Sequence, residues 1–302
     1  MKLVVAKTIL CHAVKRRGWD GTTERTGRAE ACVVSQDQQN IWSALRGRNS
    51  FRKVRLRLAR LAPNDAAELR LRDRKYHRAA GAEGAAVVVN YARDHEGAER
   101  VVREITGKGG RAIAVQGDVA QRSDAQRLVA EVKRAFGRLD VLVNNAGVFS
   151  FAPFEQFSEQ EFHRQFNTNV LGMFLMIEAA LPAFGAEGGS IINIGSETSV
   201  TANPTLSIYV ASKSAVNGLT RVLSKEFGPR KIRVNALNPG GTETEGTHAA
   251  GVMGTEFKKQ IVASTSLGRV GQPEDIARVA AFLASDDAGW LTGEIMFANG
   301  GK

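Results

Sequence analysis

From Gly81 onward, short runs of β-branched residues alternate with longer amphipathic stretches. The runs predict buried strands at 86–91, 112–115, 141–143, 190–194, 232–236 and 294–298, with helices over about 96–106, 123–136, 158–184 and 207–227 and after Pro273. Strands that are apolar on both faces, each followed by a helix, are typical of a parallel sheet covered on both sides. We therefore predict an α/β fold with a Rossmann-type, doubly wound parallel sheet over residues 81–302.

The first 80 residues follow a different pattern. They carry 19 Lys and Arg against 7 Asp and Glu, whereas the other 222 residues carry 22 against 24, so this segment produces the net charge of +10. Residues 51–61 alternate basic and apolar types, which fits an exposed strand or a basic arm, although an unstructured segment is the simpler interpretation. We expect residues 1–80 to be a divergent basic segment, separate from the domain over 81–302.

Three residues have the chemistry of a carbonyl-reducing site. Tyr209 and Lys213 are four residues apart on one predicted helix, and Ser196 follows a predicted strand at the carboxyl edge of the sheet, where ligands bind in such folds. A carbonyl that accepts hydride needs a proton donor and a second hydrogen bond at its oxygen. A free Tyr would need about 4 kcal/mol to ionise at pH 7, and a neighbouring Lys cation lowers that cost.

Further motifs accompany these residues: N-N-A-G at 144–147, I-N-I-G-S at 192–196, Y-V-A-S-K at 209–213 and N-P-G at 238–240. Together they resemble the classical short-chain dehydrogenase/reductase family, which includes 3-oxoacyl-carrier-protein reductases and glucose dehydrogenases. The resemblance covers about 81–301. It implies that Tyr209 is the general acid/base, that Lys213 lowers its pKa and holds the nicotinamide ribose, and that Ser196 orients the substrate carbonyl. Asn169, in F-N-T-N-V, matches the family position that anchors a proton-relay water at a helix bend.

The resemblance also implies a cofactor site along the same edge of the sheet, with Tyr209 and Lys213 at its nicotinamide end. The other implied contacts are Asp118 and Val119 beside the adenine, Asn145, Ala146 and Gly147 along the cofactor, Pro239 and Gly240 of the N-P-G turn, and Thr242 and Thr244 toward the nicotinamide amide and pyrophosphate. The segment of about 241–266 would form a mobile lid over the substrate. We expect no metal site.

The end of the strand at 86–91 bears on the choice of cofactor. NAD enzymes place an Asp or Glu there for the ribose 2′-hydroxyl, whereas this chain has Asn90, Tyr91, Ala92 and Arg93, with no acid before Asp94. A carboxylate would repel a 2′-phosphate, and an Arg can pair with it. Asn90 and Arg93 are therefore predicted to bind cofactor, and NADP(H) is favoured over NAD(H).

The first strand of the family and its glycine-rich phosphate loop are not recognisable upstream, and no glycine lies between Gly47 and Gly81. One hypothesis is that residues up to about Ala80 come from a shifted reading frame. Alternatively, residues 3–6 or 31–34 could fill the vacant strand position, although both look like ordinary apolar runs. A chain without the phosphate loop could also be an inactive relic that serves as a binding or scaffold protein.

On these grounds we expect an NADP(H)-dependent oxidoreductase that acts on a small-molecule carbonyl or alcohol. No apolar run reaches the roughly 18 residues of a membrane span, and two cysteines without a disulfide pattern favour a reducing compartment. The expected location is cytoplasmic, with no membrane or nucleic-acid partner. The resemblance implies a homotetramer.

Overall fold

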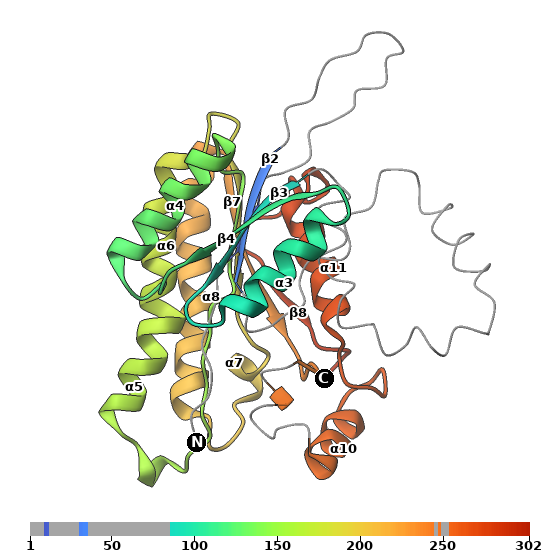
Figure 1. Ribbon diagram of the computed structural model, residues 1–302. Helices are drawn as coiled ribbons and strands as arrows, with labels where there is room; N and C mark the ends of the chain where they lie inside the picture. The colour runs from blue at the N-terminus through green and yellow to red at the C-terminus, as the bar shows by residue number, and fades with distance from the viewer. Residues whose placement is uncertain (1–8, 12–29, 36–84, 245–246, 249–253) are drawn as a thin grey trace, which may run out of the picture.

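The computed structural model describes residues 9–11, 30–35, 85–244, 247–248 and 254–302 (Figure 1). Its strands are β1 (Ile9–Cys11), β2 (Glu30–Ser35), β3 (Ala85–Tyr91), β4 (Arg111–Gln116), β5 (Val141–Asn144), β6 (Gly189–Ile194), β7 (Ile232–Pro239) and β8 (Ile295–Ala298). The main helices are α3 (His95–Thr106), α4 (Arg122–Phe136), α5 (Glu159–Phe166), α6 (Gly172–Ala180), α7 (Thr198–Thr201), α8 (Ser207–Phe227), α10 (Thr255–Ser264) and α11 (Pro273–Ala284). Short helical turns are η2 (Phe154–Gln156), η3 (Asn167–Leu171), η4 (Leu181–Ala183), η5 (Gly228–Arg230) and η6 (Asp286–Ala288).

The described strands form one sheet in the order β4-β3-β2-β1-β5-β6-β7-β8, and a direct pairing also joins β2 to β5. Every pairing in it is parallel except those of β1, which runs antiparallel to β2 and β5. The strand order and the helical crossovers confirm the predicted doubly wound α/β fold.

The N-terminal segment contributes to this sheet. β2 pairs in parallel with β3 and with β5, so it occupies the position of the first strand of the doubly wound sheet. The interpretation of residues 31–34 as an ordinary apolar run was therefore wrong. Without a strand here, β3 and β5 would expose backbone N–H and C=O groups inside the fold, and such groups are costly to leave unpaired. Residues 3–6, 51–61 and the segment that follows β2 lie outside the described residues.

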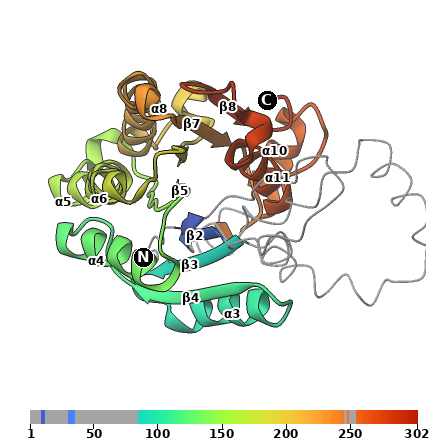
Figure 2. The same ribbon diagram turned by 90° about the horizontal axis from the view of Figure 1, so that it is seen from above.

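Helices cover both faces of the sheet, as the view from above shows (Figure 2). On one face α4, α6 and α8 pack through residues such as Leu128, Met176 and Val216 against strand residues such as Val88. On the other face α3 and α11 pack against a second set of strand residues that includes Val87. Adjacent strand residues thus point to opposite layers, which explains why the strands are apolar throughout.

The predicted long helix over 158–184 is interrupted. It consists of α5, the π-helical turn η3, α6 and the 3₁₀ turn η4. By length and composition Glu159–Ala183 could cross a membrane, with a mean hydropathy of 1.2 over its most apolar window. However, 44% of that window is buried, and the stretch contacts α4 and α8, as a core helix of a soluble protein does.

Candidate active site

Tyr209 and Lys213 lie in the first two turns of α8, and Ser196 follows β6 at the carboxyl edge of the sheet. All three side chains are buried, and Tyr209 shares a side-chain hydrogen bond with Ser196. The Lys213 Nζ lies 5.8 Å from the centroid of the Tyr209 ring and donates a hydrogen bond of 2.8 Å to the Ile194 carbonyl. Thr198 donates to the Ser196 Oγ from its backbone N at 3.3 Å and from its hydroxyl at 3.0 Å. The structure thus brings the three predicted residues together.

Burial controls the protonation of this group. It raises the pKa of Tyr209 to about 12, and the hydrogen bond with Ser196 only partly opposes that shift. Burial also lowers the pKa of Lys213 to about 8, so its amine is still mostly cationic at pH 7. Tyr209 is thus protonated at neutral pH. The effect of Lys213 on the pKa of Tyr209 stays a prediction.

Asn169 lies in η3, where the backbone makes one π turn and the Gly172 N–H bonds to the Asn167 carbonyl. Its amide N donates to the Val148 carbonyl and to the Ser212 Oγ, each at 2.9 Å, and its Oδ1 accepts from the Val148 N–H at 2.8 Å. The side chain therefore ties the segment after β5 to α8. Such π turns often occur at functional sites.

The backbone approaches the same group at Gly147. A Cβ there would lie 3.2 Å from the Lys213 Nζ and 3.6 Å from the Asn169 Oδ1. The absent side chain keeps the space beside the ammonium open. A cavity of about 10 Å³, enough for one water, is lined by residues that include Asn144, Asn169 and Val216.

Known proteins share this architecture. The profile of a family described as enoyl-(acyl carrier protein) reductase matches residues 74–302. An uncharacterized oxidoreductase of Methylorubrum extorquens is 54% identical over 219 residues, which are 72% of this chain and 88% of that protein. The 3-oxoacyl-[acyl-carrier-protein] reductase of Staphylococcus aureus is 41% identical over 220 residues, which are 72% of this chain and 88% of that protein. The chain belongs to the short-chain dehydrogenase/reductase family. It is therefore a nicotinamide-dependent oxidoreductase.

A solved member of the family supports the same assignment. The blue fluorescent protein from a metagenomic library, crystallised in complex with NADPH, aligns with a TM-score of 0.68 and 35% identity. The alignment covers 73% of this chain and 88% of that one.

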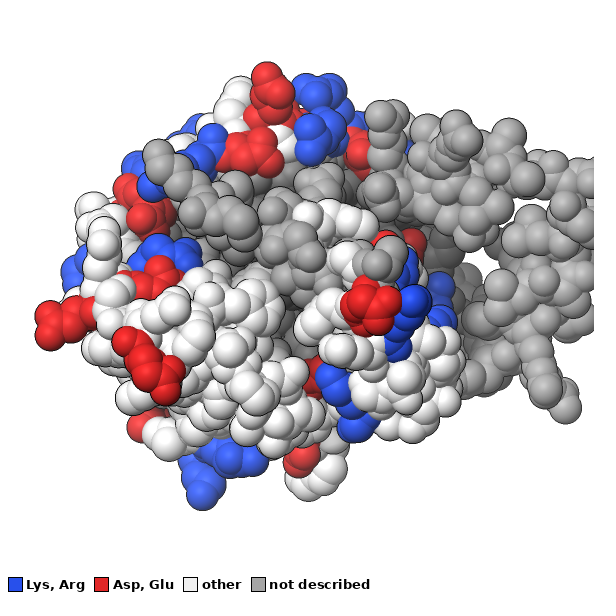
Figure 3. Space-filling view, turned by 90° about the horizontal axis from the view of Figure 1, so that it is seen from below, with Lys and Arg blue, Asp and Glu red and all other residues white. Residues whose placement is uncertain are grey.

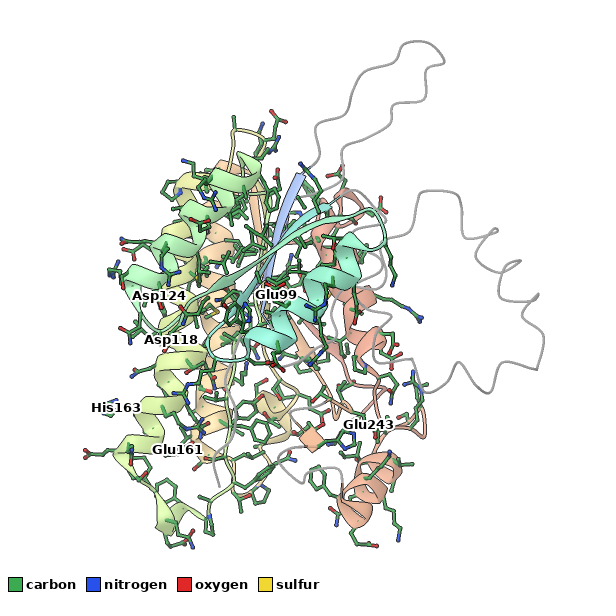
Figure 4. All side chains as sticks on the ribbon, in the orientation of Figure 1. Glu99, Asp118, Asp124, Glu161, His163 and Glu243 are labelled. Carbon is green, nitrogen blue, oxygen red and sulfur yellow. The ribbon has the colours of Figure 1, made fainter. Side chains whose placement is uncertain are left out.

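At the adenine end, the predicted short-chain dehydrogenase/reductase positions differ in exposure. Asp118 is exposed and its backbone N–H donates to Asp124, which lies beside it (Figure 4). Val119 is buried against Gly172 of α6. Arg93 is exposed after β3, and within the described residues its side chain makes no ion pair.

The Asn90 side chain at the end of β3 is fully buried, and its amide donates to the carbonyls of Val115 at 3.2 Å and Gly117 at 2.8 Å. These hydrogen bonds join β3 to the end of β4. A contact between Asn90 and the cofactor stays a prediction.

The remaining predicted positions follow β5 and β7. Asn145 is buried, and Ala146 and Gly147 are half-buried. Pro239 is the last residue of β7, and Gly240 follows it. The Thr242 hydroxyl donates to the Gly240 carbonyl at 2.9 Å, and the Thr244 hydroxyl forms a hydrogen bond with the Thr247 hydroxyl. The chemistry of these residues and of Arg93 fits a nicotinamide dinucleotide along the edge, because they offer backbone groups, amide and hydroxyl side chains and one exposed cation. The residues after β2, where a phosphate loop would lie, are outside the described part of the chain.

Glu197 and Phe149 were expected to shape the pocket, but the directions of their side chains could not be predicted from sequence. Glu197, next to Ser196, is buried and paired with Lys302, whose Nζ lies 2.9 Å from its Oε1. Phe149 contacts the Tyr209 ring, with centroids 5.7 Å apart. Both contacts join residues that are distant in sequence, and neither residue belongs to a motif that would have predicted the contact.

The predicted lid contains α10. Lys258 of α10 donates to the Glu243 carboxylate at 3.0 Å, and His248 approaches the same carboxylate at 3.3 Å. The Lys258 contact connects α10 to the segment that follows β7, where Glu243 lies between Thr242 and Thr244. The movement of α10 over a substrate stays a prediction.

Proposed function

We propose that the chain is an NADP(H)-dependent oxidoreductase that interconverts a small carbonyl compound and its alcohol, with Tyr209 as the general acid/base. One observation supports this proposal most directly. Tyr209, Ser196 and Lys213 lie together at the carboxyl edge of the sheet, and Gly147, which has no side chain, lies beside Lys213.

The proposed roles follow from the contacts. A bound nicotinamide supplies or accepts hydride at the substrate carbon. Tyr209 donates its proton to the carbonyl oxygen, and Ser196 provides the second hydrogen bond at that oxygen. Lys213, cationic at pH 7, stabilises the phenolate that remains on Tyr209.

The preference for NADP(H) rests on the end of β3. The acid nearest to this strand, Asp94, caps α3 by accepting a hydrogen bond of 2.8 Å from the Gly97 N–H. Its carboxylate is therefore committed to the helix, whereas the exposed Arg93 is suited to a 2′-phosphate.

Fluorescence titration with NADPH, with NADH as the control, tests cofactor binding by the whole chain. We expect micromolar binding that favours NADPH. Replacement of Arg93 by Ala should weaken NADPH binding about 10- to 100-fold and leave NADH binding unchanged. Arg100→Ala, on the exposed side of α3, is the matched control. Equal binding of both cofactors would overturn the preference, and no binding up to millimolar would favour the inactive-relic alternative.

Substitution of Tyr209 by Phe tests the general acid. It removes the hydroxyl and keeps the ring, so kcat should fall by about 10²- to 10⁴-fold while NADPH still binds. A variant with nearly full kcat would exclude Tyr209 as the proton donor.

We further propose a cytoplasmic homotetramer. Leu171, Phe174 and Val222 are exposed apolar side chains on η3, α6 and α8, which supports self-association on this side. Light scattering that gives the mass of a monomer would count against it.

A further inference from the structure

An aromatic segment runs from the cofactor edge past the proposed proton donor. It is V-F-S-F-A-P-F-E-Q-F, residues 148–157, directly after Gly147. The Phe149 ring lies 5.7 Å from the Tyr209 ring at 56°, and Phe151 meets Phe149 edge to face at 5.6 Å and 88°. Gly147 adjoins the Lys213 ammonium and Phe149 contacts Tyr209, so the Phe149 ring lies beside the place where a substrate carbonyl would meet Tyr209, and Phe151 extends the aromatic surface from it.

Hydrogen bonds hold this segment in place. Glu161 of α5, visible at the lower end of that helix in Figure 4, accepts from the Ser150 hydroxyl at 2.7 Å and pairs with Arg164. Arg164 in turn donates to the Phe149 carbonyl at 3.2 Å. The Ala152 N–H donates to the Thr205 carbonyl at 2.9 Å. These hydrogen bonds hold the backbone that carries the two rings in one conformation. The segment therefore loses less conformational entropy when a rigid ligand binds.

The segment offers little to a polar substrate. Its one hydroxyl, on Ser150, donates to Glu161 and accepts from Gln165. Phe151 and Phe154 are 47% and 72% exposed, so the apolar surface continues outward from Tyr209. Seen from below, this end of the molecule presents a broad region without charged side chains, with Lys, Arg, Asp and Glu mostly around it (Figure 3). The rings of Phe149 and Phe151 offer no hydrogen bonds, so a sugar packed against them would lose hydration without compensation.

We infer that the substrate is an aromatic carbonyl compound, whose ring packs against Phe149 and Phe151 while its carbonyl oxygen meets Tyr209 and Ser196. This inference rests on the proposed function and specifies its substrate class. Phe149 is then a specificity-determining residue. Aromatic pairs contribute beyond their buried area by an amount that corresponds to about 2- to 12-fold in affinity.

The test compares NADPH-dependent reduction of 2-tetralone with that of 2-decalone, a ketone of similar size whose second ring is saturated. The measured quantity is the ratio of the two kcat/KM values. In Phe149→Leu, which keeps apolar volume but removes the ring, this ratio should fall about 2- to 12-fold from its wild-type value. The intrinsic reactivities of the two ketones cancel in this comparison.

Two further variants complete the test. Phe151→Leu should lower the ratio as well, and because Phe151 is half-exposed its replacement leaves the core intact. Phe282→Leu, an exposed Phe on α11, is the matched control and should leave the ratio unchanged. An unchanged ratio in both Phe149→Leu and Phe151→Leu would overturn the inference.

Other carbonyl compounds separate this inference from the proposed function. Turnover of ethyl acetoacetate or oxidation of D-glucose, with neither cyclic ketone reduced, would overturn the aromatic substrate and leave the oxidoreductase proposal standing. No turnover of any of these compounds, together with no NADPH binding, would overturn both.

Discussion

The pair between Glu197 and Lys302 yields a prediction for stability. The Glu197 side chain is 5% exposed, and its Oε1 accepts from the Lys302 Nζ at 2.9 Å. Its second oxygen, Oε2, is buried without a hydrogen-bond partner among the described residues and faces Gly240. Lys302 is thus the cation that compensates this carboxylate. Replacement of Lys302 by Met would keep the aliphatic stem and leave the carboxylate buried without a counter-ion.

The magnitude follows from burial. Removal of one partner of a fully buried pair costs about 3–5 kcal/mol. The Lys302 side chain is 20% exposed, so water already reaches the ammonium, and we expect a smaller loss of about 2–3 kcal/mol in the free energy of unfolding. For a domain of this size that corresponds to a fall in Tm of roughly 5–10 °C.

Urea denaturation of Lys302→Met and of the double variant with Glu197→Gln measures the effect. The double variant should recover at least about 1 kcal/mol, because a neutral amide is cheaper to bury than an unpaired carboxylate. Lys259→Met is the matched control, since Lys259 forms an exposed pair with Glu256 and its loss should cost less than about 0.5 kcal/mol. If Lys302→Met were no more destabilising than Lys259→Met, the assignment of Lys302 as the essential counter-ion would be refuted.

Two further substitutions test the interaction of Glu161 with Arg164 and the backbone conformation at Gly188. The hydrogen bond from Arg164 holds the pKa of Glu161 at about 2, below its ordinary 4.5, so this stabilisation is complete above pH 4.5 and is lost as the pH falls toward 2. Glu161→Gln should therefore cost about 1–2 kcal/mol at pH 7 and almost nothing near pH 2, and a cost independent of pH in urea titrations would contradict this account. Gly188→Ala should cost about 3 kcal/mol, because φ is +79° and the new Cβ would lie 2.1 Å from the Lys231 carbonyl oxygen. Gly185→Ala, where a Cβ has open space, should be far milder, and equal falls in Tm would be evidence against the steric reason.

Periodicity predicted most of the fold because each element satisfies its own local pattern. The helix expected over 207–227 is α8, with the same bounds, and the strand at 190–194 lies within β6. The predicted helix over 158–184 was too regular, since its apolar composition persists through η3 and hides the change in hydrogen bonding. A π turn leaves no mark in a hydropathy pattern.

The position of the first strand could not be predicted from local sequence. Residues 31–34 resemble many other apolar runs in their sequence. They are recognised as a strand only through their pairing with β3 and β5. The proximity of Tyr209 and Lys213 was predictable because the two residues share one helix. The surroundings of the two residues were not, because Phe149 and Lys302 reach the site from remote parts of the chain.

The π turn at η3 has a consequence for the length of the chain at that point. A π turn holds one residue more than an α turn, so a deletion of one residue within 167–171 would let the helix continue in regular α form. The helix before the turn and α6 after it would keep about the same relative orientation, and the side chains within the turn would change direction. Asn169 could then no longer reach Val148 and Ser212 together, so the segment after β5 and α8 would lose the hydrogen bonds that join them. At this turn the number of residues, and not their identity alone, determines whether the candidate site is held together.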